Sequence, residues 1–254
     1  MSPDVHIVIP ARYASTRLPG KVLLDLGGQP LLQRTWSAAS NSGYEVWVAV
    51  DDARVQSAVE AFGGRSLMTP SELRSGTERV AYVARHRAWP ADDIVVNVQA
   101  DEPFFPPSYV GQLVEPLVED PSLGMSSLAC RIDQRDQIFS EHCVKVVCNL
   151  RGDALYFSRA PIPWVRGGMA EERAPSGFYL RHIGAYAYRV GMLIQLADLP
   201  EAPSEVSESL EQLRALHHGI SIRIRAVDSA PPPGIDTPAD LERARALLSE
   251  HSQR

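Results

Sequence analysis

The chain has 254 residues, of which 44% are hydrophobic and 22% charged, and its formal net charge at pH 7 is -6. A chain of this length can bury one sizeable core, so we expect a single domain, residues 1–254, with a small protruding subregion. The negative charge argues against general nucleic-acid binding, because the phosphate backbone would repel such a surface.

The cysteines and the apolar runs indicate the cellular compartment. Cys130, Cys143 and Cys148 cannot all pair with one another, and none has the spacing of a metal-binding motif. No apolar stretch approaches the roughly 20 residues needed to cross a bilayer, and Asp4 precedes the first apolar segment where a secretory signal would carry basic residues. We therefore expect a cytoplasmic protein with reduced thiols and no membrane partner.

In the first half of the chain, apolar runs of strand length alternate with amphipathic helical stretches. Strands are expected at 5–9, 46–50 and 94–98, and helices at 31–40, 53–62 and 109–118. Such alternation predicts parallel strands joined by crossover helices, with helices covering both faces of the sheet. The fold class is therefore α/β.

The pattern changes after Met125. Strands follow one another closely at 126–132, 144–150 and 154–157, which predicts antiparallel pairing among them. The stretch 160–177 is rich in Pro and Gly and too irregular for a core, so we expect it to form an arm or a lid.

The loop after the first strand carries Arg12, Arg17 and Lys21. Open α/β sheets bind ligands at the carboxyl ends of their strands, where this loop would lie. Arg offers a planar fork to phosphate oxygens and Lys a mobile point charge, so the three cations suit a polyphosphate. Taken by itself, a loop with three cations is more often a solvated basic turn.

Two acidic residues follow other expected elements. Asp101 comes directly after the strand at 94–98, where it could bind Mg²⁺, which takes one or two protein carboxylates and fills its other positions with water and phosphate. A turn that ends a strand is the alternative for Asp101. Asp236 precedes Thr237 and Pro238, which form a good helix start, so Asp236 needs no further function on its own pattern.

The stretch Ser75-Gly76-Thr77-Glu78-Arg79 precedes a helical run. Gly76 would let the backbone approach a ligand, and the helix start would offer unpaired N–H groups. A plain helix cap explains the same pattern.

An ordered set of motifs from the first strand to the last helix resembles the CMP-Kdo synthetases, the 3-deoxy-manno-octulosonate (Kdo) cytidylyltransferases. The motifs are IPARYASTRLPGK at 9–21, SGTER at 75–79, NVQADEP at 97–103, ALYFSRAPIPW at 154–164, LRHIG at 180–184, LEQLR at 210–214 and GIDTP at 234–238. The chain departs from the family at Ala100, where Gly is usual, and at 140–143, where an Asn-Pro turn is commoner.

The resemblance implies a Rossmann-like nucleotidyltransferase fold with a mainly parallel central sheet. It also implies a small antiparallel subregion, at about 125–190, that makes a homodimer contact and lies on the sugar side. The implied reaction joins CTP to Kdo to give CMP-Kdo and pyrophosphate, for lipopolysaccharide biosynthesis.

The resemblance also assigns roles to individual residues. The implied catalytic residues are Arg12, Arg17, Lys21 and Asp101, and the implied Mg²⁺ ligands are Asp101 and Asp236. The implied nucleotide contacts are Pro10, Ala11, Arg12, Lys21, Arg74, Ser75 and Thr77. The implied sugar contacts are Arg79, Gln99, Arg159, His182, Tyr186 and Glu211. On local pattern alone, a surface or strand residue without a functional role is the commoner interpretation for each of the last four.

Three alternatives stay open at this point. A CMP-sialate synthetase shares the chemistry, but its first loop favours a Gly-Gly-Ser-Lys run that is absent here. An 8-amino-octulosonate cytidylyltransferase differs at the far end of the sugar, which no side chain in the sequence reports. An inactive nucleotide-sensing dimer would keep the cations but lose the metal carboxylates or sugar contacts, whereas Asp101, Asp236, Arg159 and His182 are all present.

Overall fold

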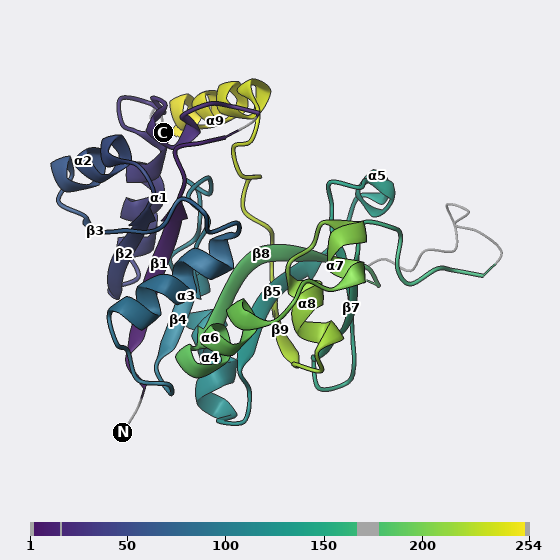
Figure 1. Cartoon of the computed structure of the whole chain (residues 1–254). Helices are drawn as coiled ribbons and strands as arrows, with labels where there is room; N and C mark the ends of the chain where they lie inside the picture. Colours follow the sequence, from purple (N-terminus) through teal and green to yellow (C-terminus); the bar gives the residue numbers. More distant parts are fainter. Residues whose placement is uncertain (1–2, 16, 167–177, 252–254) are drawn as a thin grey trace. The chain divides into compact units, whose positions relative to one another are not determined.

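The structure, a computed structural model, describes residues 3–15, 17–166 and 178–251 (Figure 1). Contacts divide the chain into two compact units, Met1–Gly111 with Pro231–Arg254, and Gln112–Ala230. The first unit is therefore discontinuous in sequence. The expected single domain with a subregion at about 125–190 stays a prediction, as does the arm at 160–177, most of which lies outside the described residues.

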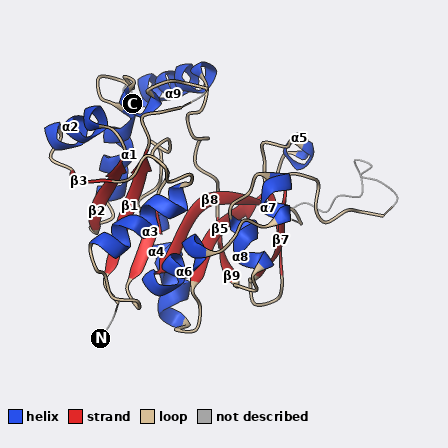
Figure 2. Cartoon of the chain, in the orientation of Figure 1, coloured by secondary structure: helices blue, strands red, loops and turns tan. Residues whose placement is uncertain are grey.

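The first unit contains the alternating elements expected from the sequence (Figure 2). Its elements are β1 (Val5–Ala11), η1 (Lys21–Leu23), α1 (Leu31–Ser40), β2 (Glu45–Val50), α2 (Ala53–Ala61), β3 (Arg65–Met68), α3 (Gly76–His86), β4 (Ile94–Asn97) and α9 (Pro238–His251). Helix α4 (Ser108–Glu119) begins in this unit and ends in the second.

The strands of the first unit form a parallel sheet with the order β3-β2-β1-β4. Helices α1 and α2 pack on β2 and β3, and α3 packs on β1 and β4. Strand β4 is buried along its whole length and β1 along nearly all of it, as expected for strands covered on both faces. The predicted α/β class with a mainly parallel sheet is confirmed.

Helix α9 fixes the segment that precedes it against the first unit. Its cap is reciprocal: the Asp240 amide donates to Thr237 Oγ1 at 3.2 Å, and the Thr237 amide donates to Asp240 Oδ2 at 2.8 Å. The helix start predicted at Thr237-Pro238 is confirmed. An apolar cluster holds the helix and this segment in place, and its buried members are Leu26, Leu31, Ile235, Leu241 and Ala244.

The second unit mixes strand directions. Its elements are β5 (Met125–Arg131), α5 (Arg135–Phe139), β6 (Lys145–Cys148), β7 (Ala154–Ser158), β8 (Leu180–Arg189), α6 (Val190–Asp198), α7 (Pro203–Glu208), α8 (Gln212–His217) and β9 (Ile222–Val227). Strands β6 and β7 pair antiparallel, as predicted. The expectation that β5 joins them is wrong, because β5 lies between β8, antiparallel, and β9, parallel.

Nowhere in the described ranges does a helix combine the length and apolar character that crossing a bilayer requires.

We expect Leu241→Ala to destabilise the protein by about 2–4 kcal/mol, because it removes buried methyl groups from the cluster that anchors α9. Urea denaturation followed by circular dichroism measures this change. Val206→Ala is the control, since Val206 is 63% exposed and its truncation should change stability by less than about 0.5 kcal/mol. An effect of Leu241→Ala as small as the control's would show that the cluster does not anchor the helix.

Candidate active site

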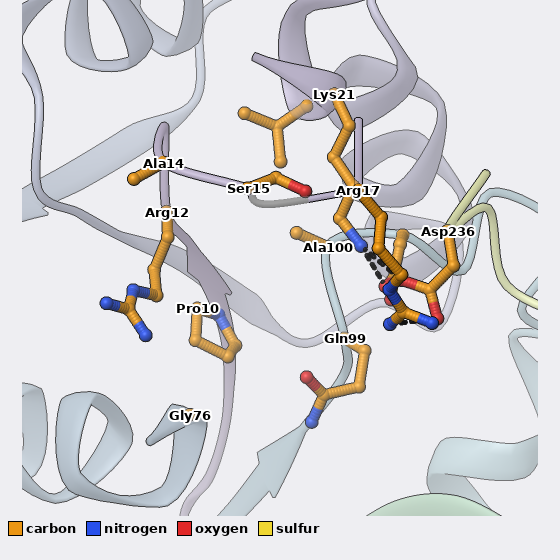
Figure 3. A pocket seen from close by; sticks show the side chains of 12 residues that line it. Pro10, Arg12, Ala14, Ser15, Arg17, Lys21, Gly76, Gln99, Ala100 and Asp236 are labelled. Carbon is orange, nitrogen blue, oxygen red and sulfur yellow. Dashed lines mark hydrogen bonds and ion pairs between the residues drawn. The ribbon is translucent and has the colours of Figure 1, made fainter. Parts of the chain in front are cut away.

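A cavity of about 270 Å³ lies in the first unit, where β1 and β4 end at their carboxyl ends (Figure 3). The start of α3 and the segment before α9 also contribute to its wall. The lining residues are Pro10, Arg12, Ala14, Ser15, Arg17, Lys21, Val22, Gly76, Gln99, Ala100, Asp101 and Asp236. The cation loop and the two acidic residues predicted from the sequence therefore share one pocket.

Lys21 lies between the two carboxylates. Its Nζ donates to Asp101 Oδ2 at 2.6 Å and to Asp236 Oδ1 at 2.9 Å. Arg17 adds a second ion pair, with its guanidinium 2.9 Å from Asp236 Oδ2. Figure 3 shows Arg17, Lys21 and Asp236 gathered at one side of the pocket. The two carboxylates thus converge on one position suited to a cation.

Backbone contacts bring the two acidic residues together. The amide of Ile235 donates to the carbonyl oxygen of Asp101 at 2.9 Å, which ties the segment before α9 to the loop after β4. At Gly234, a Cβ atom would lie 3.2 Å from Glu102 Oε1 and 3.3 Å from the Asp101 carbonyl oxygen. Gly234 therefore permits this close approach. The sequence reasoning missed Gly234 and Ile235, although both belong to the GIDTP motif.

The charges around Lys21 keep its ammonium group protonated. Partial burial acts to lower the pKa of Lys21, but the charges and hydrogen bonds of Asp101 and Asp236 outweigh it and raise that pKa above its ordinary value. The cation at this position is therefore permanent at neutral pH.

The donor set at this position fits a hard divalent cation. The described residues contain no group of three or more His, Cys, Asp or Glu side chains arranged for a metal ion. Mg²⁺ needs no such group, because it binds through one or two carboxylates and takes its remaining ligands from water and phosphate. Asp101 and Asp236 supply two carboxylates that already face a common cation.

Arg12 lies on the other side of the pocket from Lys21 (Figure 3). Its Nη1 donates to the carbonyl oxygen of Arg74 at 3.0 Å, and its Nε is 3.8 Å from Asp51 Oδ2. The Arg12 side chain remains 43% exposed. Cations thus face the pocket from two sides, which suits a ligand carrying several phosphate groups.

The start of α3 forms a further part of the pocket wall. Ser75 caps the helix, accepting a hydrogen bond from the Glu78 amide at 3.1 Å, so the cap predicted from the motif is confirmed. A Cβ at Gly76 would lie 3.3 Å from Pro10 Cγ, which is a tight approach, and 3.6 Å from Gln99 Oε1, which is an ordinary contact distance. Ala11, Ser75 and Thr77 are next to lining residues in the chain, and the Arg74 carbonyl accepts a hydrogen bond from the lining residue Arg12. The nucleotide contacts of all four stay predictions.

Of the predicted sugar contacts in the first unit, Gln99 lines the pocket and Arg79 lies in the interior. The Arg79 side chain is fully buried; it donates to Thr69 Oγ1 at 2.6 Å and to the Leu73 carbonyl at 3.1 Å, and it lies 3.3 Å from Asp51. These contacts give Arg79 a structural role in holding the segment before α3. A sugar contact by this guanidinium stays a prediction.

Three predicted sugar contacts gather in the second unit. The rings of His182 and Tyr186 lie 5.5 Å apart, and His182 Nε2 is 2.9 Å from Ser127 Oγ. Burial lowers the pKa of His182 to about 3, so the ring is neutral at pH 7. Burial also raises the pKa of Tyr186, with smaller contributions from the charges of Tyr188 and Glu211. This cluster can offer hydrogen bonds to hydroxyl groups.

Arg159, the fourth candidate in the second unit, is held by backbone carbonyls. Its Nε donates to the Glu208 carbonyl at 2.7 Å and its Nη1 to the Glu141 carbonyl at 2.8 Å. The Glu208 carboxylate accepts from the Arg159 amide at 2.8 Å. The guanidinium is thereby fixed in direction, and its contact with a sugar carboxylate stays a prediction.

Lys145 supports Arg159 from the interior. Its Nζ is fully buried and donates to the carbonyl oxygens of Ser140, Cys143 and Arg159. The same contacts fix the turn at 140–143, in which the chain departs from the family pattern. Sequence reasoning missed Lys145 and Glu208, because neither lies in a motif with recognisable chemistry.

We expect His182 to make stability pH-dependent below neutrality. The unfolded chain takes up a proton on His182 near pH 6.5, whereas the buried folded ring resists protonation down to about pH 3. The contribution of His182 to the free energy of unfolding is therefore fully present above about pH 6.5 and is lost as the pH decreases. The loss between pH 6.5 and pH 5 is about 2 kcal/mol.

Denaturation curves at pH 7, 6 and 5 measure this effect in the wild type and in His182→Gln, which should show a smaller loss. His142→Gln is the control, since the His142 side chain is 88% exposed. Equal pH dependence in all three proteins would contradict the neutral buried state of His182.

Comparisons with known proteins identify cytidylyltransferases, whose nucleotide substrate suits a pocket lined by cations. Residues 6–222 match the model of a family described as cytidylyltransferase. A 3-deoxy-manno-octulosonate cytidylyltransferase of Marinomonas sp. (strain MWYL1) is 47% identical over 254 aligned residues, covering 97% of this chain and 96% of the relative. One of the same name from Pseudomonas syringae pv. syringae (strain B728a) is 48% identical, covering 98% and 99%.

Solved structures agree with these relatives. The structure of a CMP:2-keto-3-deoxy-manno-octonic acid synthetase complexed with CTP superposes with a TM-score of 0.89 at 46% identity, covering 98% of this chain and 99% of that one. A cytidylyltransferase from Leptospira borgpetersenii serovar Hardjo-bovis (strain JB197) superposes with a TM-score of 0.62 at 17% identity, which shows a shared fold.

Proposed function

The chain belongs to the cytidylyltransferase family, within its 3-deoxy-manno-octulosonate branch, and we infer that it transfers CMP from CTP to Kdo with release of pyrophosphate. Both the protein relatives and the CTP-bound structure match nearly the whole chain. The predicted enzyme class is thereby confirmed. We propose that the product serves lipopolysaccharide biosynthesis.

The observation that carries this function is the pocket in which Lys21 and Arg17 meet Asp101 and Asp236. Transfer of a nucleotidyl group needs cations that neutralise a triphosphate and a leaving pyrophosphate, and it needs a place for a hard metal ion beside them. The pocket brings Arg17 and Lys21 together with two carboxylates at the carboxyl ends of β1 and β4, which supports this proposal.

In the proposed reaction, the anomeric hydroxyl of Kdo loses its proton to solvent as its oxygen attacks the α-phosphorus of CTP, and the bond to the pyrophosphate oxygen breaks on the opposite side. Arg12, Arg17 and Lys21 stabilise the negative charge that develops on the departing pyrophosphate. The proposed role of Gln99, which lines the pocket just after β4, is to donate a hydrogen bond to the sugar. No covalent enzyme intermediate is needed.

We propose Mg²⁺ as the cofactor, with Asp101 and Asp236 as its protein ligands. When bound there, the ion supplies positive charge next to the reacting phosphate. The sugar contacts proposed for the second unit are Arg159 for the carboxylate, and His182, Tyr186 and Glu211 for the hydroxyl groups. A neutral His182 is suited to hydroxyl groups because it both donates and accepts.

The relatives support Kdo over the alternatives. Two of them are named 3-deoxy-manno-octulosonate cytidylyltransferase, and they are 47% and 48% identical to this chain over nearly their full lengths. An inactive nucleotide sensor is disfavoured, because the cations and both carboxylates are not only present but assembled in one pocket.

We expect the protein with Mg²⁺ to release pyrophosphate from CTP and Kdo, and much more slowly from UTP or ATP, or from sialic acid as acceptor. An enzyme-coupled pyrophosphate assay measures each pair, with 8-amino-Kdo as an additional acceptor. Asp101→Asn is the matched control, since it keeps the side-chain shape and should lower the rate by roughly 10²-fold or more. Turnover of sialic acid or 8-amino-Kdo equal to that of Kdo would refute the sugar assignment.

We further propose that the protein is a homodimer formed through the second unit. Exposed apolar side chains lie on β7 and in the segments that precede and follow it in the chain: Leu150, Leu155, Tyr156 and Trp164. A second copy of the chain would remove them from water.

We also propose that the protein is cytoplasmic, where its free cysteines, Cys130, Cys143 and Cys148, would stay reduced.

Sedimentation velocity should give a dimer for the wild type and a folded monomer for Leu155→Glu, because a charge cannot be buried in an apolar interface without a partner. Val118→Glu places the same charge at another exposed apolar position, on α4, and should remain dimeric. A monomeric wild type at micromolar concentration would rule out this dimer.

A further inference from the structure

Lys21 occupies the position between the two carboxylates that the proposed function gives to a metal ion. The ammonium nitrogen lies 2.6 Å from one Asp101 oxygen and 2.9 Å from one Asp236 oxygen. Both carboxylate groups are thereby engaged by the protein's own cation.

The charges of this network are balanced. Lys21 and Arg17 carry two positive charges, and Asp101 and Asp236 carry two negative charges. A divalent ion entering such a network meets no net negative charge, and it must displace an ammonium group from two short hydrogen bonds. Coulomb repulsion between Lys21 and the ion opposes its entry further.

A triphosphate changes this balance. It brings several negative charges to the pocket and offers Lys21 phosphate oxygens in exchange for the carboxylates. Lysine suits such an exchange, because its charge is a point on a flexible four-carbon stem. The Lys21 side chain lines the cavity and is 15% exposed, so its ammonium faces the space that phosphate groups would enter.

We propose that Lys21 acts as an internal cation that closes the metal site in the nucleotide-free protein. The divalent ion gains Asp101 and Asp236 only when a triphosphate draws Lys21 away. The proposal rests on the proposed function, which assigns these carboxylates to a metal, and it adds an order of events. Metal and nucleotide bind as one unit, and the metal-free protein keeps its carboxylates paired.

The test measures Mn²⁺ binding to the protein without nucleotide, by electron paramagnetic resonance and by isothermal titration calorimetry. Wild type should bind Mn²⁺ weakly. Lys21→Met keeps most of the length of the side chain but removes the ammonium group from both carboxylates, leaving Arg17 on Asp236 as the remaining cation of the network, so it should bind Mn²⁺ at least roughly tenfold more tightly. A non-hydrolysable CTP analogue should tighten Mn²⁺ binding strongly in wild type and much less in Lys21→Met.

Two variants test whether a gain in Mn²⁺ affinity comes only from the loss of a positive charge and whether it depends on the carboxylates of this site. Arg54→Met also removes one positive charge from the first unit and frees a single carboxylate, Asp52, and its Mn²⁺ affinity should equal that of wild type. Lys21→Met combined with Asp236→Asn should lose the gain in affinity. Should Lys21→Met fail to fold, Lys21→Gln replaces it. Mn²⁺ should also raise the melting temperature of the single variant more than that of wild type.

The outcomes separate this inference from the proposed function. Wild type and Lys21→Met binding Mn²⁺ equally well without nucleotide would overturn the role of Lys21 while leaving the metal site in place. No Mn²⁺ binding by either protein, with or without the analogue, would overturn the metal site itself. The pyrophosphate assay tests the reaction independently of both.

Discussion

The active site depends on the contact of one ammonium group with two carboxylates. Lys21, Asp101 and Asp236 come from segments far apart in the sequence of the first unit, and the ammonium group is the charge that joins the two carboxylates. The hydrogen bond from the Ile235 amide to the Asp101 carbonyl brings the carboxylates to a common position, and the apolar cluster beneath α9 keeps Ile235 there. Charge pairing at the surface of the pocket thus relies on apolar packing below it.

Much of the fold could be predicted because its signals are local. Helix α1 (Leu31–Ser40) has the predicted bounds, and the other helices and strands predicted in the first half differ from the observed ones by one or two residues at most. The strand partners of β5 could not be predicted in this way. Its neighbours β8 and β9 lie far along the chain, and pairing between distant strands depends on tertiary packing that a local apolar pattern does not encode.

The residues of the candidate site also differ in how far the sequence alone predicts them. Arg12, Arg17 and Lys21 were recognisable from their chemistry and their place after a strand, whereas Asp236 looked like part of a helix start and was assigned only by resemblance. Both interpretations of Asp236 are compatible, since it precedes a capped helix and also faces Lys21. Arg79 shows the opposite case: it is a motif residue with suitable chemistry, but its side chain lies in the interior, and no local pattern around it predicts that burial.

The discontinuity of the first unit affects how the protein is made. A ribosome releases residues 1–111 first, then all of the second unit, and only then the segment that carries Ile235 and Asp236. Until that segment emerges, the cluster around Leu26 and Leu31 lacks its covering helix, and Lys21 has Asp101 as its acidic partner but not Asp236. The pocket can therefore hold both of its carboxylates only after the whole of the second unit has been synthesised.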